Sequence, residues 1–104
     1  MWAQLITARL KPGNGEAELQ RLYKELQDAE QPGSGLLRST AMLDQNDPTR
    51  AYMLVVFESE AKAREREQDA RRQEGLESAR QTMGEIFEGP PEFVDLAIAV
   101  DATY

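Results

Sequence analysis

The fold is decided by the stretch Arg50-Ala-Tyr-Met-Leu-Val-Val-Phe-Glu-Ser59, in which residues 52–57 are all apolar or aromatic. Aromatic and β-branched residues are typical of strands, and a strand whose alternate side chains are all apolar is buried on both faces. Helices of the same chain can cover one face. A chain of 104 residues has little left to cover the other. The sequence therefore predicts that a second copy covers it, in a homodimer.

Length and composition limit the classes of function. The 104 residues are enough for one domain, and we expect residues 1–104 to form a single core. The net charge of -7 repels phosphate backbones and anionic membrane surfaces, which argues against nucleic acid and membranes as partners. No run approaches the ~20 apolar residues of a membrane span, and we expect a cytoplasmic protein.

Neither cysteine nor histidine occurs in the chain. Their absence excludes disulfides, thiol nucleophiles and the usual Ser-His-Asp triad. It also excludes imidazole and thiolate ligands for a metal. We therefore expect no metal site, and most hydrolase mechanisms are excluded.

The rest of the chain alternates between strand and helix patterns separated by turns. We expect strands at Trp2–Leu10, Leu36–Leu43 and Phe93–Asp101 beside the central one, and helices from an Asn14 cap to the turn at Pro32–Gly35, at Glu60–Gln68 and at Glu74–Glu88. The order strand, helix, strand, strand, helices, strand is that of the ferredoxin-like split β-α-β fold. The prediction is an α+β sandwich in which helices cover one side of a four-stranded antiparallel sheet.

Residues 60–72 are densely charged and contain few apolar side chains. Basic and acidic residues alternate there, and the only apolar ones are Ala61, Ala63 and Ala70. Such a pattern favours a solvated helix face, with an anion site as the alternative.

Three segments carry a resemblance to a known family. They are Met1-Trp2-Ala3-Gln4 at the start, Val55-Val56-Phe57-Glu58-Ser59-Glu60-Ala61 after the central strand, and Gly89-Pro90-Pro91-Glu92-Phe93 before the last strand. With these segments the whole chain resembles the antibiotic-biosynthesis-monooxygenase-like family of dimeric α+β barrels. The resemblance implies that two four-stranded sheets face each other in a dimer. Because the segments are structural junctions, they indicate the fold better than the activity.

The resemblance implies several possible functions. The family includes cofactor-independent oxygenases of aromatic polyketides, haem-degrading enzymes, quinol oxygenases and members of unknown role. The polyketide oxygenases act on electron-rich substrates that activate oxygen themselves, so they need an apolar pocket, a few polar groups and no cofactor. We therefore expect a cofactor-free monooxygenase of a small hydrophobic or aromatic compound. The alternative is a non-catalytic dimer that binds a small ligand or has a structural role.

Candidate pocket residues are polar or amphipathic side chains, and two large apolar ones, on elements that should be buried. They are Trp2, Gln4, Arg9, Arg38, Thr40 and Tyr52 on the strands and Met83 and Phe87 on the helix side. Each also fits a role in packing or in an interface. Arg38 lies among apolar neighbours, so a buried Arg38 needs an anionic partner, either a substrate or Glu58.

The haem-degrading branch gives a first testable prediction. The resemblance implies that this branch has a histidine as iron ligand, an asparagine on the first strand and a tryptophan at the end of the third strand. This chain has no histidine, its first strand has no asparagine, and Phe57 stands where the tryptophan would be. Only methionine or tyrosine could take the place of imidazole. We expect haemin titration to give no saturating shift of the Soret band. A shift that saturates near one haem per chain would contradict this prediction.

Overall fold

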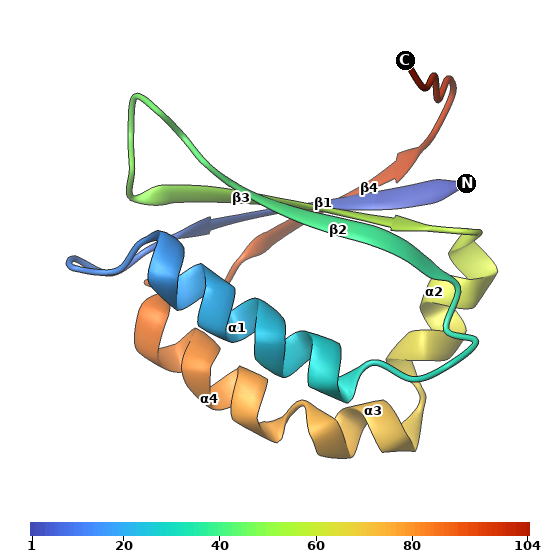
Figure 1. Ribbon diagram of the computed structural model, residues 1–104, viewed down its shortest axis with the longest axis horizontal. Coiled ribbons are helices and arrows are strands. Elements are labelled where there is room, and N and C mark those ends of the chain that lie inside the picture. Colours follow the sequence, from blue (N-terminus) through green and yellow to red (C-terminus); the bar gives the residue numbers. More distant parts are fainter.

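A computed structural model describes residues 1–104 as one sheet with all helices on a single face (Figure 1). The elements are β1 (Trp2–Arg9), α1 (Glu16–Ala29), β2 (Leu36–Leu43), β3 (Arg50–Phe57), α2 (Glu60–Glu67), α3 (Ala70–Gly75), α4 (Glu77–Ile86) and β4 (Glu92–Ala97). The order of elements and the ferredoxin-like α+β fold predicted from the sequence are confirmed. None of the helices combines the length and the apolar character needed to cross a membrane.

The sheet has the strand order β2-β3-β1-β4, and every neighbouring pair is antiparallel. The stretch quoted first forms β3, which lies between β2 and β1. β2 and β3 form an antiparallel hairpin whose loop spans residues 44–49. β3 therefore has strand neighbours on both edges, as its apolar sequence requires.

The two faces of β3 have different surroundings. Ala51, Met53 and Phe57 point toward the helices, where Ala51 and Met53 belong to the main core. Because successive side chains alternate, Tyr52 and Leu54 point to the opposite face of the sheet. The main core is completed by side chains from β1, the helices and the segment after α4, namely Ala8, Leu10, Leu19, Leu22, Ala29, Leu76, Ala79, Ile86 and Phe87.

Helix α2 is held to the sheet mainly by two arginines. The guanidinium of Arg64 lies 5.1 Å from the ring centre of Trp2, and that of Arg66 lies 5.3 Å from the ring centre of Phe57. Cations attract the faces of aromatic rings, and the long arginine stems cover apolar surface. Ala63 is the one buried residue of α2. A helix with almost no apolar stripe is thus attached through stacked cations.

The start of α1 differs from the prediction. The residue before the helix is Gly15, whose N–H donates to the Glu18 carboxylate at 2.8 Å. The Asn14 side chain instead donates to the carbonyl of Lys11 at 3.1 Å. The prediction of Asn14 as the helix cap is wrong because its amide closes the preceding turn.

The single helix predicted at Glu74–Glu88 is also wrong, since α3 and α4 are separated at Leu76. Leu76 is buried in the core, and Gly75 before it is a weak helix former. A Cβ on Gly75 would lie 2.9 Å from the Cβ of Ala29, so α3 approaches α1 too closely for a larger side chain. Asp69 caps α3 by accepting from the Arg71 N–H at 2.9 Å.

The last strand is shorter than predicted, because it ends at Ala97 rather than Asp101. Ala97 pairs with Trp2, the first residue of β1. Residues 98–101 extend beyond the end of that neighbour and have no strand to pair with.

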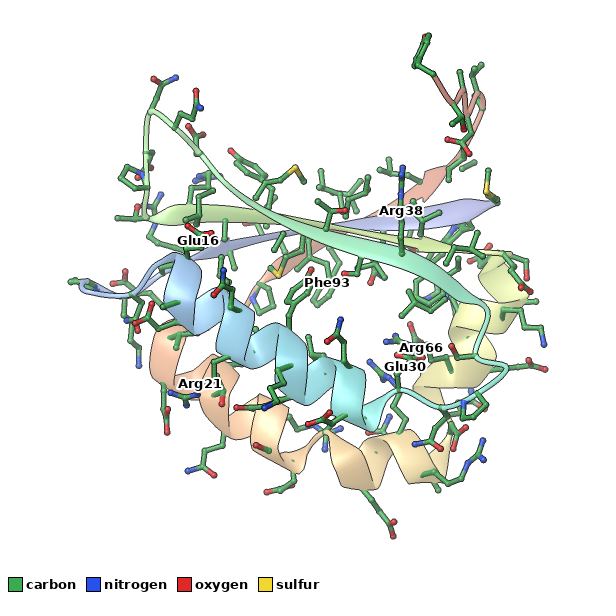
Figure 2. All side chains as sticks on the ribbon, viewed as in Figure 1. Glu16, Arg21, Glu30, Arg38, Arg66 and Phe93 are labelled. Atoms are coloured by element: carbon green, nitrogen blue, oxygen red, sulfur yellow. The ribbon has the colours of Figure 1, made fainter.

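The sheet face opposite the helices is uncovered in a single chain (Figure 1). Its apolar side chains include Leu54 in the centre and three that are exposed, namely Met42, Val94 and Leu96. Arg38 also points away from the helices on this face (Figure 2). This is the face on which we expect the predicted second copy to pack.

We expect Val94→Asp to weaken that homodimer. Val94 is 47% exposed in the single chain, so a carboxylate costs a monomer little, whereas burial between two sheets would desolvate the charge. The wild type should sediment as a dimer and show a Tm that rises with protein concentration. Val94→Asp should sediment as a monomer or unfold at a Tm lower by several degrees.

Ala17→Asp is the matched control, because it adds the same charge at an exposed position of α1. It should leave sedimentation and Tm unchanged. A monomeric wild type whose Tm does not depend on concentration would contradict the dimer.

Candidate functional site

A groove of about 500 Å³ lies between α1 and the edge strand β2. Its lining comprises Glu16, Leu19, Gln20 and Tyr23 from α1 and Ser39, Thr40, Ala41 and Leu43 from β2. Pockets for small ligands typically measure about 300–1,000 Å³ and combine apolar walls with a few polar groups. The groove fits that description in size and lining.

The local sequence of each element explains this lining. Leu19 and Tyr23 are four residues apart, which places them on the same face of α1. On β2, Ala41 pairs with Met53 and therefore shares its helix-facing side. Ser39 lies on that side too, two residues away. The small side chains of Ser39 and Ala41 leave space beneath α1.

Tyr23 provides the central polar group of the groove. Its hydroxyl lies 2.8 Å from the Ser39 hydroxyl, and either oxygen can donate the hydrogen bond. Burial raises the pKa of Tyr23, and the hydrogen bond with Ser39 offsets only part of this effect. The phenol therefore stays protonated at neutral pH and can donate to an oxygen atom of a ligand. At the start of α1, Gln20 donates to the Glu16 carboxylate at 3.4 Å.

The residues predicted from the sequence do not converge on one cavity. Thr40 lines the groove, at the edge of the sheet. Arg38 and Tyr52 lie on the uncovered face, whereas Met83 and Phe87 pack in the core.

Trp2 and Gln4 belong to a polar and aromatic cluster on the helix side of β1. Gln4 donates to Asp95 at 3.0 Å, and Arg64 donates to the other oxygen of this carboxylate at 3.0 Å. These hydrogen bonds, that from Gln4 first, hold the pKa of Asp95 below its usual value. Trp2 packs on Phe57 with ring centres 5.9 Å apart. The polar groups of Gln4 and Arg64 are thus both bound to Asp95.

The strand arginines and Tyr52 have simpler surroundings. Arg38 is exposed and forms no ion pair with Glu58 or with any other carboxylate of the chain. Tyr52 donates to Asp44 at 3.3 Å. Arg9 donates to the Thr49 hydroxyl at 2.7 Å, at the end of the sheet. Arg38 is therefore not buried, and the ion pair with Glu58, one of the two partners considered for a buried Arg38, is not formed within one chain.

Sequence reasoning missed two aromatic residues on the helix side of the sheet. Tyr23 has a recognisable signal, because it lies four residues after Leu19 at the border of the apolar stripe of α1. Phe93 pairs with Ile6 and points toward the helices (Figure 2), yet it is 57% exposed. Its exposure depends on where the helices end above β4, which the sequence does not encode locally.

The raised pKa of Tyr23 predicts how stability depends on pH. Above about pH 10, where a free phenol ionises, the folded state keeps a proton that the unfolded state loses. The free energy of unfolding should therefore fall as pH rises through this range. In Tyr23→Phe this fall should be shallower, as measured by denaturant unfolding at a series of alkaline pH values. Equal slopes for Tyr23→Phe and wild type would show that Tyr23 is not the group responsible.

Sequence comparisons give no match: no protein-family model and no curated protein matches the chain. Solved structures match over nearly its whole length.

A protein from Nitrosomonas europaea, provisionally named an antibiotic biosynthesis monooxygenase, has a TM-score of 0.71 at 19% identity, covering 96% of this chain and 100% of its own. Rv0793 from Mycobacterium tuberculosis has a TM-score of 0.70 at 14% identity, covering 98% of both chains. A Bordetella bronchiseptica protein with the same provisional name has a TM-score of 0.67 at 18% identity, covering 95% of this chain and 97% of its own. The chain therefore has the fold of proteins named antibiotic biosynthesis monooxygenases, which confirms at the level of the fold the resemblance in its three junction segments.

Proposed function

We propose that the protein is a cofactor-independent monooxygenase that binds a small hydrophobic or aromatic compound in the groove between α1 and β2. The observation that carries the proposal is the lining of this groove. Leu19, Ala41 and Leu43 form apolar walls beside the half-buried phenol of Tyr23. Proteins of the same fold that are named monooxygenases support the type of reaction.

The proposed reaction needs only the substrate and O₂. The anion of an electron-rich aromatic compound with a ring CH₂ group transfers an electron to O₂, and the two radicals combine to a hydroperoxide at that carbon. Loss of water then leaves a carbonyl. One oxygen atom of O₂ enters the product, and the other leaves as water with the two hydrogens of the CH₂ group. The carbon loses four electrons, and these electrons reduce O₂.

The protein would contribute binding, orientation and stabilisation of charge. Leu19 and Leu43 pack against the rings and reduce the apolar surface that the substrate exposes to water. The Tyr23 hydroxyl donates to the substrate oxygen that carries the negative charge, while the Ser39 hydroxyl donates to Tyr23. A fixed donor of this kind favours the anion that reacts with O₂.

A second candidate is a dimer that binds a small ligand without reacting with it. The position of the groove at the edge strand β2, where solvent reaches it, favours this alternative, because oxygenation is helped by excluding water. In that case ligands should bind in the groove with no consumption of O₂.

Turnover of anthrone tests the proposal. With no added metal or flavin, we expect the protein to accelerate O₂ consumption and to form anthraquinone in equal amount, with one labelled oxygen when labelled O₂ is supplied. Tyr23→Phe should lower kcat by about tenfold or more, since a donor to an oxyanion is lost. Anthrone that binds with no acceleration above the buffer rate would leave the binding protein as the function.

Tyr52→Phe is the matched comparison, because it also removes a phenolic hydroxyl, but from the uncovered face of the sheet. It should leave kcat unchanged if the groove is the site. A loss of turnover in Tyr52→Phe and not in Tyr23→Phe would move the site to the opposite face of the sheet, beside Arg38.

A further inference from the structure

A polar pocket of about 100 Å³ lies between the loop after α1 and helices α2 and α3. It shares no lining residue with the groove between α1 and β2. Apart from Pro32 and Gly33, every lining side chain is polar or charged. Its charged groups are the cations Lys62, Arg66, Arg71 and Arg72 and the carboxylates Glu30, Glu65 and Asp69. The lining is thus net positive in a chain whose net charge is -7.

Two of these cations already have carboxylate partners. Arg66 binds both oxygens of Glu30, at distances of 2.7 and 3.0 Å, and the two residues meet at the end of α1 (Figure 2). Burial raises the pKa of Glu30, but Arg66, Ser34 and Arg72 together lower it further, to below its usual value. Arg71 donates to Asp69 at 2.9 Å.

The other two cations have no partner. Arg72 and Lys62 are both half-buried, and neither forms an ion pair or a side-chain hydrogen bond. Burial and then the positive charge of Arg66 lower the pKa of Arg72, against a weaker opposite effect of Glu30. A half-buried guanidinium without a carboxylate is costly, and an anion would offset this cost. The remaining carboxylate of the lining, Glu65, is exposed.

We propose that this pocket binds a phosphoryl oxyanion, either free phosphate or a phosphate monoester, between Arg72 and Lys62. A guanidinium presents a planar fork of N–H groups that matches two oxygens of such a group, and an ammonium adds a compact positive charge. The pocket measures about 100 Å³, whereas a single water molecule needs only about 10–15 Å³. The pocket therefore has room for a tetrahedral anion. The carboxylates bound to Arg66 and Arg71 are already neutralised and repel it less.

Calorimetric titration with inorganic phosphate, at constant ionic strength set with sodium chloride, tests the proposal. The wild type should bind one phosphate per chain, and phosphate should raise its Tm by mass action. Arg72→Gln should weaken binding by about tenfold, the scale expected for losing a charged hydrogen bond. The phosphate affinity of Arg72→Lys should lie between those of the wild type and Arg72→Gln, because lysine keeps the positive charge but lacks the planar fork of N–H groups.

Lys24→Gln is the matched control, since it removes one positive charge from an exposed position of α1. Its phosphate affinity should equal that of the wild type. If Arg72→Gln does not fold, Lys62→Gln takes its place and should also weaken binding. A repeat with methyl phosphate distinguishes the sources, because equal affinity indicates a site for monoesters and binding of inorganic phosphate alone indicates a site for the free ion.

Three results would overturn the proposal. One is a wild type whose Tm responds to phosphate no more than to chloride. Another is equal phosphate affinity in the wild type and in the folded Arg72→Gln or Lys62→Gln variant. The third is a loss of phosphate affinity in Lys24→Gln equal to that in Arg72→Gln, which would show that only the overall charge of the protein matters. None of these results bears on oxygenation in the groove between α1 and β2.

Discussion

The apolar character of β3 on both of its faces is the constraint on which the rest of the structure depends. Its side chains are apolar on each face, so each face needs a cover. The helix layer supplies one through the core around Met53, and the arginines of α2 extend that cover over Phe57. The opposite face, which includes Leu54, has no helix packed against it (Figure 1). The fold is thus built around a strand that one chain covers on one side only.

The groove follows from how the helix layer lies on the sheet. Between the helices and the sheet, Leu10, Leu22 and Ile86 are almost completely buried. On the edge strand β2, Ser39 and Ala41 present small side chains beneath α1, and the hydroxyls of Tyr23 and Ser39 join the two layers there. A tyrosine suits this place because its ring packs on apolar neighbours while its hydroxyl finds a polar partner. The same features leave space for a small ligand.

Much of the fold could be predicted from local patterns. The alternation of strand and helix patterns predicted the order of the elements, and the apolar residues 52–57 identified β3. The break at Leu76 could not be predicted, because it depends on the close contact of Gly75 with Ala29. The functional regions were harder still. Thr40, one of the predicted residues, lines the groove, whereas Tyr23 was not predicted because its position there depends on β2, which the chain reaches only after α1.

The contact between Gly75 and Ala29 also bears on which sequences this fold can tolerate. A methyl group on Gly75 would lie within 2.9–3.0 Å of the Cβ and Cα atoms of Ala29, so any larger residue forces α3 away from α1. Glu30 follows Ala29, and Arg72 precedes Gly75 by less than one turn. Two of the smallest side chains in the protein therefore set the width of the space in which the charged groups meet. Substitutions can accumulate on the exposed helix faces with little consequence, whereas at this crossing a single added carbon atom would reshape a site that it does not touch.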